Sequence, residues 1–132
     1  MLKDTPAFSG FSVDDLQAAQ KFYGSVLGIK VEDTGMGLQL YLGGGCTVFV
    51  YAKDNHAPAT YTMLNFVVTD IDTAVSKLIA KGVVMEIYPG MHQDEKGIAR
   101  GRVGHMGPDI AWFKDPAGNI LAVLQNEDAV PN

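Results

Sequence analysis

The sequence predicts an α+β fold of two similar halves, each made of a strand, a helix and then three strands. The stretches Phe11–Gly28 and Phe66–Gly82 repeat Phe, Val, Asp, an aliphatic residue and Ala at the same spacing. After the acidic residue of each copy, the apolar period changes from two to about 3.6, which is typical of a strand followed by a helix. The duplication therefore predicts two copies of one structural unit.

Both predicted helices begin and end at recognisable residues. In the first copy the apolar residues share one face from Leu16 to Leu27, and Gly28 ends the helix. In the second copy the apolar face begins at Ile71 and the helix ends at Gly82. Asp15 and Asp70, or Asp14 and Thr69 one residue earlier, stand where a side-chain oxygen can accept hydrogen bonds from the first N–H groups. We expect these residues to cap helices rather than to act in catalysis.

Short apolar runs separated by glycines predict the remaining strands. The runs are Leu38–Leu42, Thr47–Tyr51, Val83–Tyr88, Ile98–Val103, Asp109–Phe113 and Ile120–Leu124. The polar segment 52–60 contains a proline and is the natural linker between the halves. We therefore expect one domain over residues 1–132, with module one at about 6–52, the linker at about 53–60 and module two at about 61–126.

Composition excludes several classes of protein. The 132 residues are 47% hydrophobic, enough for a core without disulfides, and Cys46 is the single cysteine. A formal charge of −5 and a pI near 4.9 disfavour binding to nucleic acid or to anionic membranes. No apolar run approaches the roughly 20 residues of a membrane span, and the N-terminal residues lack a signal-peptide pattern. The sequence therefore predicts a cytoplasmic protein.

Several motifs together resemble one known family over nearly the whole chain. They are Val13-Asp14-Asp15-Leu16, Phe22-Tyr23, Val26-Leu27-Gly28, and the late stretch Trp112–Leu121 with its Asp115-Pro116-Ala117-Gly118-Asn119 turn. The chain resembles the vicinal-oxygen-chelate superfamily, also called the glyoxalase, bleomycin-resistance and extradiol-dioxygenase superfamily. The resemblance implies two βαβββ modules whose strands form a curved mixed sheet, with the helices on the convex side and a ligand-binding cup on the concave side.

The same resemblance locates the metal-ligand positions of the metal-dependent members. In those proteins His and Glu residues from the first and last strand of each module bind a divalent ion, and the matching positions here are Phe8, Phe49, Met63 and Ala122. Such side chains do not suit a hard or borderline divalent ion. The histidines His56, His92 and His105 fall outside these positions. We therefore expect no metal and no other cofactor, and no catalytic residue is assigned.

Strand alternation predicts which residues line the cup. If Phe49 faces the cup, Thr47 and Tyr51 face it as well, whereas Val48 and Val50 pack under the helices. The expected lining residues are Phe8, Ser12, Thr47, Phe49, Tyr51, Met63, Asn65, Ala122, Trp112 and Arg102. Two alternatives stay open: the apolar residues fill a collapsed cup as core, and Arg102 is an edge-strand charge that discourages aggregation.

We therefore predict a metal-independent protein, similar to glyoxalases and bleomycin-resistance proteins, that binds a small apolar or aromatic molecule in the cup. The resemblance also implies a homodimer. The alternative is a metal-dependent glyoxalase-like lyase or isomerase, or a dioxygenase, with displaced metal ligands. Whether the chain is an enzyme is left open, with the balance against it, because catalysis of this kind depends on an ion that polarises vicinal oxygens. A third possibility is a module used only for oligomerisation or partner binding.

Overall fold

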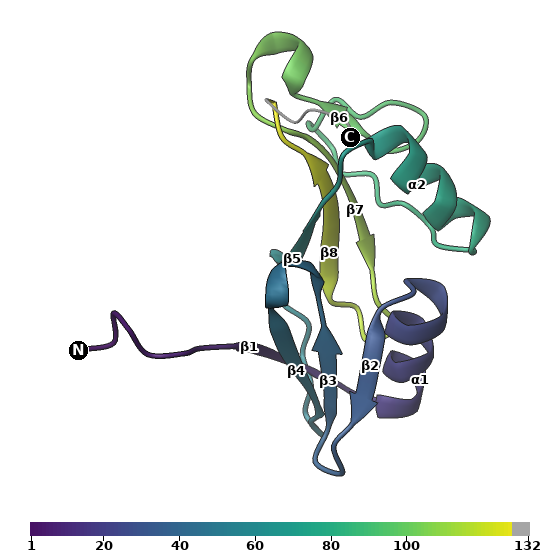
Figure 1. Cartoon of the computed structure of the whole chain (residues 1–132). Coiled ribbons are helices and arrows are strands. Elements are labelled where there is room, and N and C mark those ends of the chain that lie inside the picture. Colours follow the sequence, from purple (N-terminus) through teal and green to yellow (C-terminus); the bar gives the residue numbers. More distant parts are fainter. Residues whose placement is uncertain (128–132) are drawn as a thin grey trace. The chain divides into compact units, whose positions relative to one another are not determined.

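The computed structural model describes residues 1–127. The chain forms two compact units that divide between Pro58 and Ala59, and each unit contains one sheet and one α-helix (Figure 1). The unit boundary falls within the segment that the sequence identifies as a linker.

Unit one contains a four-stranded mixed sheet, called sheet A here. Its strands lie in the order β1-β4-β3-β2, with β1 parallel to β4 and the other neighbours antiparallel. The strands are β1 (Ser9–Val13), β2 (Lys30–Asp33), β3 (Leu38–Tyr41) and β4 (Thr47–Ala52). The sequence patterns above do not mark β2, because it is a short edge strand on which charged residues outnumber apolar ones.

Unit two contains a second four-stranded mixed sheet, called sheet B. Its strand order, β5-β8-β7-β6, follows the same plan as sheet A, and β5 is parallel to β8. The strands are β5 (Thr62–Val67), β6 (Ala99–Arg100), β7 (Asp109–Lys114) and β8 (Ile120–Gln125). Both units therefore have the βαβββ order, and the predicted α+β fold class is confirmed.

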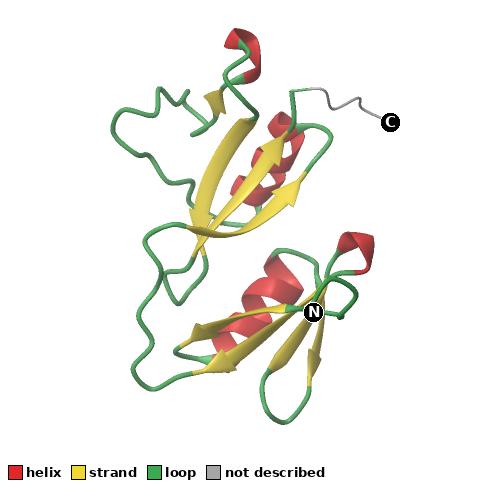
Figure 2. Cartoon of the chain, turned by 90° about the vertical axis from the view of Figure 1, so that its left-hand side faces the viewer, coloured by secondary structure: helices red, strands yellow, loops and turns green. Residues whose placement is uncertain are grey.

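In each unit a helix packs against one face of the sheet (Figure 2). The core of unit one lies between sheet A and its helix, and its fully buried residues include Val13, Tyr23, Leu38, Leu40 and Val50. The core of unit two includes Ile71, Val75, Ala111, Phe113 and Leu121. In the described part of the chain, the opposite face of each sheet carries no α-helix of its own unit, and it is called the helix-free face below.

The helix N-termini are capped as predicted. The Asp15 carboxylate accepts hydrogen bonds from the backbone N–H groups of Gln17 and Ala18, and α1 (Leu16–Gln20) follows it. The first helix then widens into a π-helical segment, η1 (Lys21–Val26), in which the N–H of Leu27 donates to the carbonyl of Phe22. The Asp70 carboxylate caps α2 (Ile71–Ala80) by accepting from the N–H of Thr73. These carboxylates therefore have structural partners.

Two predicted strands differ from the structure. Residues 83–88 form no strand, because the Gln93 side chain takes backbone groups that a strand ladder would use: its Oε1 accepts from the N–H of Tyr88, and its Nε2 donates to the carbonyl of Glu86. The predicted strand Ile98–Val103 is reduced to β6. At Gly101 the chain turns into the 3₁₀ segment η3 (Arg102–Gly104). A Cβ atom at Gly101 would lie 2.5 Å from the carbonyl oxygen of Pro108.

The late turn is built as its sequence indicates. The Oδ1 atom of Asp115 accepts from the N–H groups of Ala117 and Asn119, and its Oδ2 atom accepts from the side chain of Asn119. Asp115 and Asn119 are 4% and 1% exposed, so these bonds are made away from water.

The other short segment, the 3₁₀ turn η2 (Gly43–Gly45), links β3 to β4. Within residues 1–127, none of the helices has the length and apolar character needed to cross a membrane.

Candidate functional site

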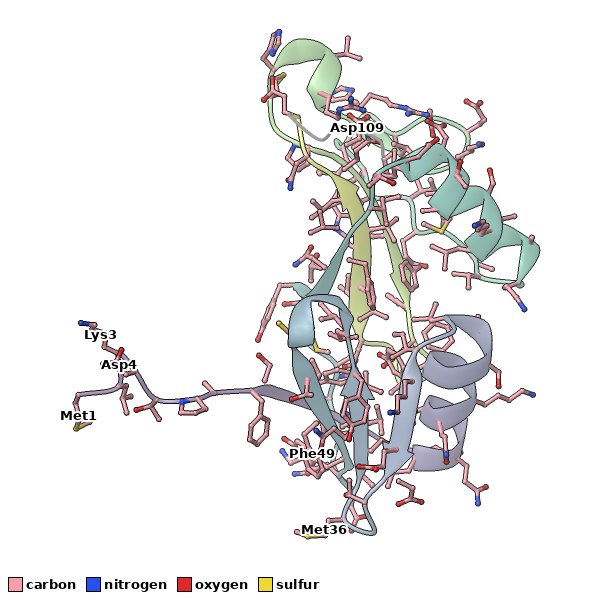
Figure 3. All side chains as sticks on the ribbon, in the orientation of Figure 1. Met1, Lys3, Asp4, Met36, Phe49 and Asp109 are labelled. Carbon is pink, nitrogen blue, oxygen red and sulfur yellow. The ribbon has the colours of Figure 1, made fainter. Side chains whose placement is uncertain are left out.

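The helix-free face of sheet A displays the residues that alternation predicts. Val48 and Val50 of β4 are 5% and 0% exposed, whereas Tyr51 is 38% exposed. Thr47, Phe49 and Tyr51 therefore lie on the face opposite to the buried valines. Phe49 lies on the side of the sheet away from α1 (Figure 3).

The strand register shows which residues surround Phe49 on this face. Gly10 of β1 stands on one side of it and Gln39 of β3 on the other. Gln39 in turn pairs with Glu32 of β2. Ser12 of β1 pairs with Tyr51, so Ser12 belongs to the same face. The predicted residues Ser12, Thr47, Phe49 and Tyr51 are thus brought together, whereas Phe8 precedes β1 and is 72% exposed.

Phe49 and Tyr51 form an ordered aromatic pair. Their ring centroids are 6.1 Å apart and their planes differ by 19°. The Phe49 ring lies over Gly37, where a Cβ atom would be 2.7 Å from Cζ of Phe49 and 2.5 Å from the carbonyl oxygen of Val50. The glycine therefore leaves the space that this ring occupies.

Polar groups lie beside the aromatic pair. The Tyr41 hydroxyl donates to Oε1 of Glu32 at 3.0 Å, and this bond raises the pKa of Tyr41 above its usual value. Nζ of Lys30 lies 4.9 Å from the centre of the Tyr41 ring. Nδ1 of His56 is 2.6 Å from Oγ of Ser12, so the linker histidine is tied to β1. This face therefore combines aromatic rings with neutral and oppositely charged polar groups.

The helix-free face of sheet B differs from that of sheet A in having buried residues on its central strands. Ala122 pairs with Trp112 on one side and with Asn65 on the other, which places all three on one face. Ala122 and Trp112 are buried, at 0% and 9% exposure, whereas Val67 of β5 is 66% exposed. Met63 lies at an irregularity in β5, where the register shifts between Thr62 and Leu64.

Tyr88 packs beside Trp112. The two ring centroids are 5.5 Å apart with planes at 75°, and Nε1 of Trp112 donates to Oγ1 of Thr62 at 3.1 Å. The Tyr88 hydroxyl is buried and has no hydrogen-bond partner among residues 1–127. Burial and the nearby carboxylate of Glu86 raise the pKa of Tyr88, so the phenol is neutral at pH 7.

Arg102 does not lie on the helix-free face of sheet B. Its backbone N–H and its guanidinium both donate to Asp109, which pairs with Gln125 on the helix-covered face. Arg102, which the sequence analysis expects to line the cup, is thus held at Asp109 in this structure. Its neighbour Arg100 joins α2 to the following loop by donating to Asp72 and to Asp94.

The residues at the four metal-ligand positions do not fit a divalent ion. Phe49 and Ala122 lie on the last strands of their units, and Met63 and Phe8 lie at or just before the first strands. All four present carbon or a thioether instead of the oxygen and imidazole donors that such ions prefer. Among residues 1–127, no three His, Cys, Asp or Glu residues lie close enough together to hold a metal.

The sequence reasoning missed Gln39, Tyr41 and Tyr88. The first two lie on the same face as Phe49, and the alternation of Leu38 and Leu40 with Gln39 and Tyr41 is a signal that could have found them. Tyr88 carries no such signal, because residues 83–88 do not form the predicted strand.

Comparisons with known proteins identify the fold. The sequence model of the glyoxalase/bleomycin resistance protein/dioxygenase superfamily matches residues 8–123. No curated protein matches the chain with significant similarity. A glyoxalase family protein from Enterococcus faecalis has a similar structure, with a TM-score of 0.65 and 20% identity over 94% of this chain and 99% of that one.

Two further solved structures share the fold. One is TnmS3, an antibiotic binding protein from a Streptomyces species, with a TM-score of 0.64 and 20% identity over 93% of this chain and 98% of that one. The other is the fosfomycin resistance protein FosX from Listeria monocytogenes, with a TM-score of 0.66 and 14% identity over 92% and 93% of the two chains. At these identities the likeness establishes the fold alone.

Proposed function

Because the chain belongs to the glyoxalase/bleomycin resistance protein/dioxygenase superfamily, we propose that it binds a small, mainly aromatic molecule on the helix-free face of sheet A without a metal ion. One observation carries the proposal: Phe49, at a position where the resemblance expects a metal ligand, forms a parallel pair with the partly exposed ring of Tyr51. Parallel rings on an accessible surface offer a planar molecule a face for stacking.

The expected affinity is modest. Ligands of drug-like size gain about 0.3 kcal/mol per non-hydrogen atom, so a ring system of about eleven such atoms gains roughly 3 to 4 kcal/mol. This corresponds to a Kd in the millimolar range. A tighter natural ligand would need further polar contacts. The antibiotic-binding and fosfomycin-resistance descriptions of two similar structures support small-molecule binding as the general function of this chain.

The first experiment measures binding of quinoline by saturation-transfer NMR at pH 7. Replacing Tyr51 by Ala removes one stacking ring, and we expect about a fivefold loss of affinity, since aromatic pairs contribute about 0.5–1.5 kcal/mol beyond burial. Met36→Ala is the matched control, because this exposed apolar side chain lies in the β2–β3 hairpin, outside the aromatic pair (Figure 3). Equal affinities for the wild type and Tyr51→Ala would exclude this surface as the binding site.

Calorimetric titration tests metal independence. We expect no stoichiometric binding when nickel, zinc, manganese or ferrous ions are added to chelator-treated protein. Tight binding of one ion per chain would overturn this part of the proposal and favour a metal-dependent enzyme.

Light scattering across a concentration series tests the implied homodimer. If dimer formation also broadens the Phe49 and Tyr51 signals, a second copy of the chain covers this face and the small-molecule proposal fails.

A further inference from the structure

Gln39 occupies the centre of the helix-free face of sheet A. It pairs with Phe49 on one side and with Glu32 on the other; Tyr41 is its neighbour on the same face of β3, and Gly37 immediately precedes this strand. Gly37 has no side chain to cover it, and the Tyr41 hydroxyl donates to Glu32. Gln39, a half-buried residue, therefore lies between an aromatic pair and a carboxylate that already accepts a hydrogen bond.

The hydrogen bonds of residues 1–127 leave the Gln39 carboxamide without a protein partner. A carboxamide carries one acceptor oxygen and an amine with two donors in a single plane. It can therefore form two parallel hydrogen bonds with a molecule that presents an N–H group next to a carbonyl.

We propose that Gln39 forms hydrogen bonds with the polar edge of the ligand. The ligand class is a planar aromatic lactam or an equivalent heterocycle with adjacent N–H and C=O groups. This inference rests on the proposed function, because the same ring would stack on Phe49 or Tyr51 while its edge meets Gln39. A partly buried site that hydrogen-bonds a ligand group binds analogues without that group more weakly, because the polar atoms of the site are then left unpaired.

The charges around Gln39 favour a neutral ligand. Glu32 and Lys30 both lie at the Tyr41 ring, one bonded to its hydroxyl and the other above its face, so their opposite charges are balanced locally. A charged ligand would therefore gain no net attraction here, and it would lose part of its hydration on binding. A neutral lactam avoids this desolvation cost.

The test compares 2-quinolone with N-methyl-2-quinolone, which keeps the ring and the carbonyl but lacks the N–H group. We expect wild-type protein to bind 2-quinolone about tenfold more tightly in NMR titrations, because the N-methyl analogue loses the N–H hydrogen bond and leaves the Gln39 amide oxygen unpaired. Gln39→Leu should bind both probes with similar affinity. Gln17→Leu is the matched control, because it removes an exposed carboxamide from α1 and should keep the tenfold preference.

Each outcome separates the two proposals. If wild-type protein binds both probes equally, or if Gln39→Leu keeps the preference, the role of Gln39 is overturned and aromatic binding stands. If wild-type protein binds neither probe, both proposals fail. Should Gln39→Leu fail to fold, Gln39→Glu serves as the second variant. Its carboxylate accepts from the lactam N–H but cannot donate to the carbonyl, so N-methyl-2-quinolone, which can bond only through its carbonyl, should bind this variant more weakly than it binds wild type. An unchanged affinity for this probe would overturn the inference.

Discussion

Gly37→Ala is the substitution for which the structure gives the most definite prediction. The new Cβ atom would lie 2.5 Å from the carbonyl oxygen of Val50 and 2.7 Å from Cζ of Phe49, and real Cβ contacts essentially never fall below 3.0 Å. The Phe49 ring can turn away, but the Val50 carbonyl is part of β4 and must move by about half an ångström. Overpacking of this kind costs about 1–3 kcal/mol, offset by about 0.4–1 kcal/mol because alanine has fewer unfolded conformations than glycine.

The net loss of about 1–2 kcal/mol should lower the melting temperature by roughly 3–8 °C for a chain of this size, which thermal unfolding by circular dichroism can measure. Gly43→Ala is the matched control, because a Cβ atom there meets nothing within 4 Å and Gly43 does not have a positive φ. We also expect weaker quinoline binding in Gly37→Ala, since the displaced Phe49 ring no longer lies parallel to Tyr51. If Gly37→Ala is as stable as Gly43→Ala, the close packing of Phe49 over this glycine is wrong.

Three further substitutions test other parts of the structure. Tyr88→Phe removes a buried hydroxyl that has no partner, so thermal unfolding should show an unchanged or higher melting temperature, and a clear loss would reveal an unrecognised partner. Arg100→Met removes the hydrogen bond that holds the pKa of Asp72 below its usual value; this stabilisation is present above about pH 4 and is lost as the pH falls further. Urea unfolding should therefore show the variant to be about 0.5–1 kcal/mol less stable than wild type at pH 7 and little different near pH 2, whereas a constant difference would contradict the linkage. Asp115→Ala leaves two backbone N–H groups and the Asn119 amide without their buried acceptor, and urea unfolding should show a loss of about 3 kcal/mol or more; a loss under 1 kcal/mol would contradict this account.

The sequence was sufficient where a local interaction decides the structure. Asp15 and Asp70 cap their helices as predicted, because a carboxylate that precedes an apolar helical face satisfies N–H groups that have no other partner. The strand β4 alternates as predicted, because burial of Val48 and Val50 against the helix fixes the direction of every other residue. In both cases the deciding groups lie within a few residues of one another.

The sequence was insufficient where a side chain from outside the predicted strand competes for its backbone. Residues 83–88 have the composition of a strand, yet the Gln93 side chain bonds to the Glu86 carbonyl and the Tyr88 N–H, and the Glu86 N–H donates to the carbonyl of Trp112 in β7 without a strand being formed. Nothing in the local pattern of that segment shows this competition. The pattern of Ile98–Val103 likewise does not show that the turn at Gly101 ends β6 early and directs Arg102 to Asp109.

At the candidate site, too, the sequence predicts some features of the structure and not others. Alternation along β4 was enough to group Thr47, Phe49 and Tyr51, but only the register between strands places Gln39 beside Phe49. Register depends on the pairing of β3 with β4, which a single sequence does not specify. The alternation along β3 indicates the face on which Gln39 lies, but its position beside Phe49 does not follow from the sequence pattern.

The packing at position 49 also bears on metal chemistry. A Glu at this position would stand beside Gln39, two strands away from the Glu32 carboxylate, and would leave the space above Gly37 unfilled. The observed phenylalanine fills that space, and Gly37 is the residue that admits its ring. Phe49 and Gly37 therefore pack together to form an aromatic surface, and this packing does not suit a metal site. Stacking on that surface requires no ion, so the same two residues that disfavour coordination favour binding of a planar ring.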